Sequence, residues 1–133
     1  MNIHSILVFS AKVCGAMILS STILLLSACK DYPRLSESEA KILVVEARYF
    51  LEKKPPLNVI LSSPKRKSSN IAKLNPIHMR ATKDGLFLVL SVEFVTENGL
   101  FISANDDFVP NGEGFDPGFK DLGNGLYYYR ISG

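Results

Sequence analysis

Residues 77–92 read IHMRATKDGLFLVLSV, two apolar-rich segments joined by Asp84-Gly85. An Asp-Gly pair is typical of a two-residue hairpin turn. A turn at these residues brings apolar side chains opposite one another on one face. The facing pairs are Ala81 with Leu88, Met79 with Leu90, and Ile77 with Val92. Because the turn signal and the apolar pattern agree, this stretch predicts an antiparallel hairpin with one buried face.

Further strands are predicted on both sides of this hairpin. The Asn98-Gly99 pair predicts a second turn, followed by a strand over residues 100–103. Residues 105–125 are rich in Asp, Asn, Pro and Gly and predict a long loop before a last strand over 126–131. A short strand is predicted over 57–61, ahead of the polar loop SSPKRKSSN.

The segment that begins at Ser36 has the pattern of an amphipathic helix. Ser36 and Glu39 have the spacing of a capping box, in which each side chain binds the other residue's backbone N–H. Pro55-Pro56 ends the segment, so we predict a helix over residues 36–54. Its apolar residues recur at helical spacing: Ala40, Leu43, Val44, Ala47, Phe50 and Leu51.

These elements predict the α+β fold class. One N-terminal amphipathic helix packs on a small, mainly antiparallel sheet of about four strands. We expect the helix to cover the sheet face that carries Leu88, Leu90, Val92 and Phe94.

The first 28 residues have the composition of an export signal. They contain Lys12 but no Asp or Glu, and residues 13–26 are mostly apolar. This apolar run is shorter than the roughly 20 residues of a membrane-spanning helix. Leu26-Ser27-Ala28-Cys29 follows, with an aliphatic residue, two small residues and a Cys. The tetrapeptide resembles the lipobox of bacterial lipoproteins.

The lipoprotein resemblance implies cleavage between Ala28 and Cys29 and attachment of fatty acyl chains, such as palmitate, to Cys29. Three parts of the chain then follow. They are a signal peptide (1–28), a lipidated Cys with a short tether (29–35) and a single small α+β domain (36–133). The membrane is therefore an expected partner, bound through the lipid on Cys29.

Two further residues, Lys30 and Cys14, refine this prediction. Lys30 stands where inner-membrane lipoproteins carry Asp, which implies the periplasmic leaflet of the outer membrane of the cell envelope. Cys14 leaves with the signal peptide, so the mature chain has no disulfide. The alternatives are an ordinary secretory signal, an uncleaved anchor, and a disulfide between Cys14 and Cys29.

Residues 74–133 also resemble a group of small uncharacterised bacterial proteins. The shared segments are LNP, DGLF, EFVTENGLF, FDPGF and LYYYRISG. This resemblance implies a common fold and carries no activity.

Charge is unevenly distributed along the chain. Residues 30–83 hold twelve Lys and Arg against five Asp and Glu, and residues 84–133 hold two against eight. The basic run Lys65-Arg66-Lys67 predicts contact with anionic headgroups or an acidic polymer; the alternative is a solvated loop. Nucleic acid is not an expected partner, because the chain carries an export signal and a net charge of only +2.

Two sets of residues are candidates for catalysis or ion binding. The predicted hairpin places His78 opposite Ser91, with Glu93 one step along, but a mid-strand Ser has neither a sharp turn nor an oxyanion hole. We assign no catalytic residue. The loop over 105–125 is rich in oxygen ligands suited to Ca²⁺, but its spacing differs from an EF-hand, so we expect neither a metal nor a cofactor. Its polar residues are Asp106, Asp107, Asn111, Glu113, Asp116 and Asp121.

Aromatic and basic residues supply a candidate binding face. Tyr127 and Tyr129 share one face of the last strand, and Arg130 lies on the other. Tyr and Arg are enriched at interfaces; the alternative, which the pattern favours, is that the tyrosines are packed strand residues. The candidate face comprises Tyr127, Tyr129, Arg130, Lys65, Arg66 and Lys67.

Taken together, these features predict a non-enzymatic, lipid-anchored envelope protein, a binding or structural module whose partner is an envelope protein or polymer. One alternative is an envelope hydrolase that uses His78, Ser91 and Glu93 or the acidic loop. Another is an inhibitor or immunity lipoprotein.

Overall fold

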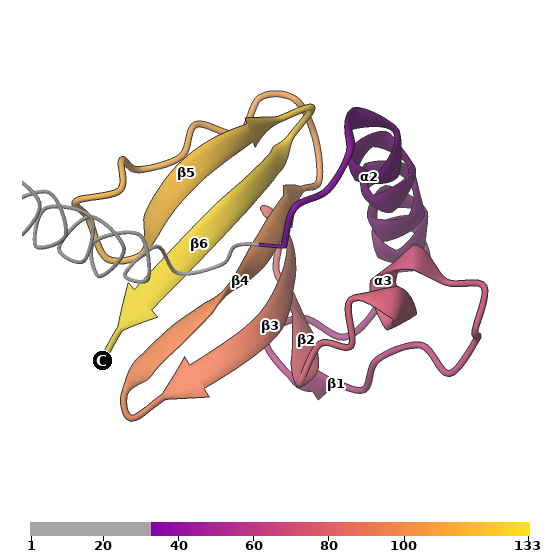
Figure 1. The fold of residues 1–133 in the computed structure, drawn as a ribbon, viewed down its shortest axis with the longest axis horizontal. Coiled ribbons are helices and arrows are strands. Elements are labelled where there is room, and N and C mark those ends of the chain that lie inside the picture. Colours follow the sequence, from indigo (N-terminus) through magenta and orange to yellow (C-terminus); the bar gives the residue numbers. More distant parts are fainter. Residues whose placement is uncertain (1–32) are drawn as a thin grey trace, which may run out of the picture. The chain divides into compact units, whose positions relative to one another are not determined.

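The computed structural model describes residues 33–133, and a six-stranded sheet forms their centre (Figure 1). The predicted signal peptide, the lipobox and Cys29 lie outside the described residues. The elements in chain order are α2 (Glu37–Glu52), β1 (Ile60–Leu61), α3 (Asn70–Lys73), β2 (His78–Ala81), β3 (Gly85–Glu93), β4 (Thr96–Ser103), β5 (Gly118–Gly123) and β6 (Leu126–Ser132).

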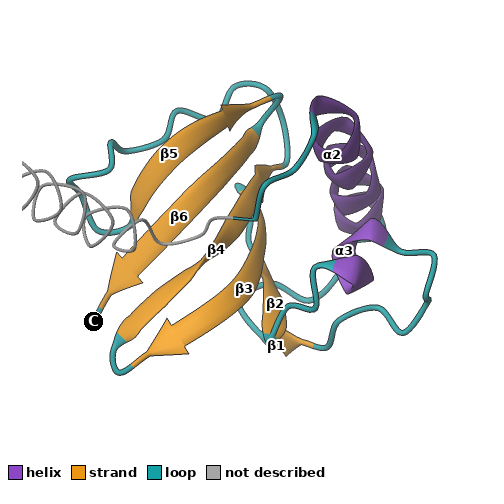
Figure 2. Cartoon of the chain, viewed as in Figure 1, coloured by secondary structure: helices purple, strands orange, loops and turns teal. Residues whose placement is uncertain are grey.

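The α+β class is confirmed, with more strands than predicted. The strand order is β1-β2-β3-β4-β6-β5, and every neighbouring pair is antiparallel (Figure 2). The sheet has six strands instead of about four, mainly because β5 lies inside residues 105–125, which were predicted as loop. The short strand predicted over 57–61 is reduced to Ile60–Leu61.

Helix α2 begins as the sequence predicts. The Ser36 hydroxyl accepts a hydrogen bond from the Glu39 N–H at 3.3 Å, and the Glu39 carboxylate accepts one from the Ser36 N–H at 2.8 Å. This reciprocal pair satisfies two N–H groups that have no partner within the helix. The helix ends at Glu52, with Lys53 as the C-cap, two residues before the predicted end.

The helices cover one face of the sheet and form the main core with it (Figure 1). Helix α2 contributes its apolar stripe, as predicted, and α3 adds Ile71. The Glu46 carboxylate on α2 accepts hydrogen bonds from the Ser69 hydroxyl and from the Asn70 N–H, which fixes the start of α3 against α2. The sheet supplies the other side of this core: Met79, Ala81, Leu86, Leu88, Leu100, Ile102 and Leu126.

The opposite face of the sheet carries a second, aromatic core. It is covered in part by the segment after β4, which contributes Phe108. We call this surface the aromatic face; its buried members are Phe87, Phe101, Phe119, Tyr127 and Tyr129.

The β2–β3 hairpin has a different register from the one predicted. Met79 pairs with Leu88, two residues from the predicted Leu90, and the turn residues are Lys83 and Asp84. The Thr82 hydroxyl accepts hydrogen bonds from the N–H groups of Asp84 and Gly85, at 3.3 Å and 3.2 Å, which favours this turn. Because a shift of two residues preserves the facing of every side chain, Met79, Ala81 and Leu88 still lie on the predicted buried face. Ile77, also predicted there, precedes β2 and is 60% exposed, so that part of the prediction is wrong.

The end of β3 departs from the prediction because of a β-bulge between Val89 and Ser91. The extra residue reverses the alternation of side chains beyond it. Val92 consequently pairs with Glu97 on the aromatic face and is 51% exposed, and Phe94 is fully exposed. The expectation that the helix covers Val92 and Phe94 is therefore wrong.

The second predicted turn is also wrong. Asn98 and Gly99 lie inside β4, and the β3–β4 turn is formed by Phe94 and Val95. The asparagine–glycine turn of this fold is Asn124-Gly125, between β5 and β6, where both residues have positive φ (58° and 78°). This is the backbone that a two-residue type I′ hairpin turn requires.

Candidate functional site

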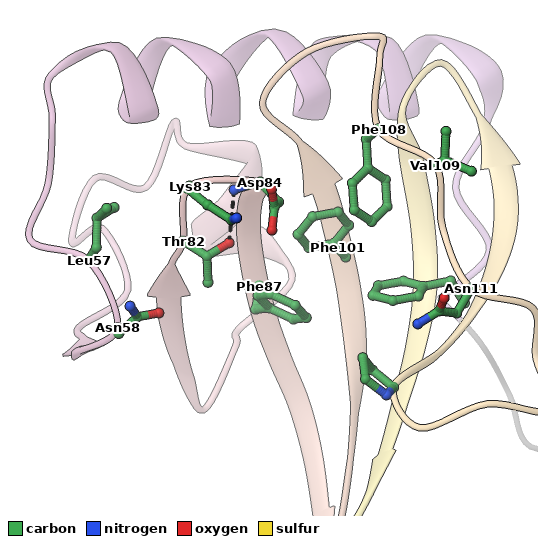
Figure 3. A pocket seen from close by; sticks show the side chains of 12 residues that line it. Leu57, Asn58, Thr82, Lys83, Asp84, Phe87, Phe101, Phe108, Val109 and Asn111 are labelled. Carbon is green, nitrogen blue, oxygen red and sulfur yellow. Dashed lines mark hydrogen bonds between the residues drawn. The ribbon is translucent and has the colours of Figure 1, made fainter.

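An open pocket of about 520 Å³ lies on the aromatic face (Figure 3). Its floor consists of phenylalanine rings from β3, β4, β5 and the segment after β4. Its rim consists of polar and small apolar residues from the β2–β3 turn and two loops. The lining residues are Leu57, Asn58, Thr82, Lys83, Asp84, Phe87, Phe101, Phe108, Val109, Asn111, Pro117 and Phe119.

The phenylalanine rings pack closely enough to form a fixed floor. The ring centroids of Phe87 and Phe101 are 4.6 Å apart, and those of Phe101 and Phe119 are 5.4 Å apart. Phe108 lies 4.8 Å from Phe101 and 5.6 Å from Phe119, so the loop is held down by its own aromatic residue. Tilted and edge-to-face pairs at these distances are favourable. The floor is therefore preformed and apolar.

The rim next to β2 carries the charged groups of the pocket. Lys83 and Asp84 are the two central residues of the turn and are both exposed. The Asp84 carbonyl accepts a hydrogen bond from the Ala104 N–H at 2.8 Å, which ties this turn to the end of β4. Within residues 33–133 the Lys83 ammonium forms no ion pair, so a positive charge is available at the rim.

A charged network lies beside the floor on the same face. The Glu97 carboxylate accepts a hydrogen bond from the Tyr129 hydroxyl at 2.8 Å and pairs with Arg80 at 3.1 Å. The Arg80 guanidinium lies 5.0 Å from the centroid of the Phe87 ring, as a cation–π contact. Burial raises the pKa of Tyr129 well above its usual range, and the hydrogen bond to Glu97 raises the pKa further. The hydroxyl therefore stays protonated and holds Glu97 in place, which connects β2, β4 and β6 behind the pocket.

The His78, Ser91 and Glu93 set is not assembled as the predicted register implied. His78 pairs with Val89, and Ser91 pairs with Asn98, whose side-chain amide lies 3.5 Å from the Ser91 hydroxyl. The β-bulge and the two-residue shift remove the facing pair on which a nucleophile and base would depend.

Three of the five carboxylates of the 105–125 segment bind separate structural groups. Asp106 pairs with Arg48 at 2.7 Å, and Asp121 accepts a hydrogen bond from the Gly123 N–H at 2.7 Å. Asp116 accepts one from the Ser132 N–H at 3.0 Å. Across the part of the chain that the structure describes, no group of three or more His, Cys, Asp or Glu is placed to hold a metal ion.

The tyrosines of the candidate binding face belong to the core. Tyr129 is completely buried and Tyr127 is 8% exposed, whereas Arg130 is exposed on the opposite face. Residues 65–67 are exposed in the loop between β1 and α3. Strand β1 forms one edge of the sheet, whereas β6 lies next to the other edge. These residues therefore do not form one continuous surface.

The pocket was not predicted, because Phe87 and Val89 on this face indicated partial packing and not a cleft, and the phenylalanines of residues 105–125 indicated only that this segment packs down. A signal was nevertheless present: Phe87 alternates with the predicted core residues of its strand, and Phe101 does so on the next. Apolar residues on both faces of a strand indicate a sheet covered on both sides. Phe108 and Phe119, in the predicted loop, supply that cover and part of the floor.

Comparisons with protein-family models, with curated proteins and with solved structures found no match. Among the helices of residues 33–133, none is sufficiently long and apolar to cross a bilayer.

Proposed function

We propose that this chain is a lipid-anchored protein of the cell envelope whose domain binds an apolar group of another envelope component in the aromatic pocket. The observation that carries the proposal is the preformed phenylalanine floor beneath an open, polar rim. Binding sites are typically concave and mostly apolar, with a few polar groups that orient the ligand. Here Lys83, Asn58 and Asn111 occupy that orienting position at the rim.

The chemistry of the pocket supports binding over catalysis. Its ionisable lining residues are Lys83 and Asp84, both exposed at a turn. The Thr82 hydroxyl is occupied by the backbone of the same turn. A buried apolar surface that excludes water is the usual centre of a protein interface.

The envelope location rests on the lipobox. Two or three acyl chains on one Cys hold a protein at a membrane almost irreversibly, since each buried CH₂ contributes about 0.8 kcal/mol. Replacing Cys29 with Ser is expected to abolish the lipid mass and to release the chain from membranes of the producing cell. Density-gradient fractionation of the unaltered protein tests the outer-membrane prediction: the protein is expected in the outer-membrane fraction, and recovery in the inner-membrane fraction would contradict it. An unchanged mass and unchanged fractionation of the Cys29→Ser protein would contradict the anchor.

Site-specific photo-crosslinking tests the pocket. Val109 lies at the pocket rim and is 87% exposed, so a photoreactive amino acid there should leave the fold intact. Val92 is a matched control, a 51% exposed valine outside the pocket lining. We expect a discrete adduct from position 109 in intact cells and none from position 92. The same adducts at both positions, or none at position 109, would contradict binding in the pocket.

One observation favours a second function, inhibition of an exported enzyme or toxin. Phe94 is fully exposed at the β3–β4 turn and has a φ of 54°, which a bulky residue rarely adopts. Phe94 is the first of the two central residues of the turn. In a type II′ hairpin turn, where only this residue has positive φ, the position normally holds Gly. Phe94→Gly should leave folding intact and abolish inhibition, measured as survival of cells that export the target; unchanged survival would exclude this role.

A further inference from the structure

The face of α2 that points away from the sheet carries a second apolar stripe. Ile42, Val45 and Tyr49 recur at intervals of three and four residues, so they align along the helix. They are 52%, 69% and 59% exposed, while the buried stripe of the same helix already fills the core. We call these three residues the outer stripe. Aligned exposed apolar residues are typical of a surface that binds another protein or a membrane.

The polar residues beside the outer stripe suit a membrane interface. The Lys53 ammonium lies 4.4 Å from the centroid of the Tyr49 ring. Lys41, one residue before Ile42, pairs with Glu37 at 2.7 Å, so its charge is already compensated. Tyrosine is enriched at the level of lipid headgroups, and lysine extends its charge towards water while its methylene chain covers apolar surface. A lysine and a tyrosine together at the border of an apolar stripe are typical of a helix that lies in the interface plane.

The length of the tether places this helix close to the bilayer. Leu35 packs against the main core, so the domain begins there. Five residues, 30–34, separate Leu35 from Cys29. Fully extended, this segment spans about 20 Å. Helix α2 begins two residues later, at Glu37, so its first turn lies close to the surface that would hold the lipid, and the helix, about 24 Å long, can lie along that surface.

We propose that the outer stripe of α2 lies on the leaflet that holds the lipid of Cys29, with Ile42, Val45 and Tyr49 at the boundary between headgroups and acyl chains. This inference rests on the proposed lipid anchor. The anchor already holds the domain at the membrane, so contact of the outer stripe with lipid is effectively intramolecular. Three apolar residues are then enough for this contact, although they would not hold an unanchored protein at a membrane. The domain then sits with α2 against the bilayer and with the aromatic face, on the opposite side of the sheet, turned away from it.

Tryptophan fluorescence tests this orientation, because the chain contains no Trp. Val45→Trp places a reporter in the outer stripe, and Phe94→Trp places a matched reporter at the fully exposed β3–β4 turn. Each lipidated full chain is reconstituted in phosphatidylethanolamine–phosphatidylglycerol vesicles. Emission from position 45 should shift to the blue and fall about twofold with brominated acyl chains, since interfacial helices lie about 5–10 Å into the boundary. Emission from position 94 should stay that of Trp in water.

The failure of this inference and the failure of the anchor give different results. If the unaltered chain does not float with vesicles, the anchor fails and the inference falls with it. If the chain floats but the reporter at position 45 is not quenched, the outer stripe does not face lipid and the inference is overturned. A blue shift without bromine quenching indicates a second copy on the stripe, and quenching at position 94 indicates another orientation; each also overturns it.

Discussion

Replacing Gly99 with Ala tests how closely the two central strands approach. An added Cβ would overlap the carbonyl oxygen of Leu88 on β3 and lie 3.0 Å from Cε1 of Tyr129. Ordinary contact begins at 3.4 Å, so both neighbours must move. The Leu88 oxygen belongs to the backbone of a central strand and cannot rotate away, so β3 and β4 must separate locally.

The expected cost follows from two opposing effects. Overpacking of a close-packed interior destabilises by about 1–3 kcal/mol, and restricting the unfolded chain through Gly→Ala stabilises by about 0.4–1 kcal/mol. With backbone as the obstacle the upper part of the first range applies, and the net loss is about 2 kcal/mol. For a domain of this size the midpoint of thermal unfolding should fall by about 8–16 °C.

The control is Gly114→Ala. A Cβ at Gly114 meets nothing within 4 Å, and the residue does not have a left-handed φ, so this change should leave stability equal or slightly raised. Urea and thermal unfolding of both variants, followed by circular dichroism on the chain from Lys30 onward, give the comparison. Equal stability of the two variants would refute the close approach of β3 and β4 at Gly99.

Three further changes test other contacts. Tyr129→Phe removes the hydroxyl that donates to Glu97 and should cost about 1.5–3 kcal/mol in urea unfolding at neutral pH. Above a pH of about 10 the unfolded chain ionises Tyr129 and the folded chain does not, so the stability of the unaltered protein should fall with rising pH more steeply than that of the variant. Arg48→Met removes the link from α2 to Asp106 and to the end of β4, and should destabilise at low salt, with Lys41→Met as the exposed control. Ser36→Ala should cost about 1 kcal/mol, measured by thermal unfolding, because the N-cap of α2 is lost.

The alternation of apolar residues predicted which side chains of the β2–β3 hairpin face the core better than it predicted which residues pair across the hairpin. Met79, Ala81 and Leu88 lie on the buried face as expected, although Met79 pairs two residues away from its predicted partner. Alternation constrains a strand only to odd or even positions, so it cannot distinguish registers that differ by two residues. The turn has to supply that distinction, and here Thr82, whose hydroxyl binds the turn backbone, outweighs the Asp-Gly signal.

Two of the four Asp-Gly and Asn-Gly dipeptides, at Gly85 and Gly99, owe their glycine to packing. A Cβ at Gly85 would lie 2.6 Å from Cζ of Phe101, and Gly99 is limited by Tyr129 and Leu88 in the same way. An aromatic ring over a strand glycine compensates for the missing side chain, a device used to stabilise sheets. The ring comes from another strand, so local sequence cannot distinguish a packing glycine from a turn glycine. Only Asn124-Gly125 has the positive φ values of a two-residue turn.

The pocket exists because the sheet has two apolar faces and the described chain has one long helix to cover them. The sheet is apolar on both faces, whereas the described chain has a single long helix, which can cover only one of them. The second face is covered by the segment between β4 and β5, and in particular by Phe108. A loop covers a flat sheet less completely than a helix does, because it has no regular stripe of apolar side chains. The pocket is the part of the phenylalanine layer that this segment leaves uncovered, so its position depends on how far the segment extends over the sheet. A shorter side chain at Phe108 should enlarge the opening, whereas the main core beneath α2 should be unaffected.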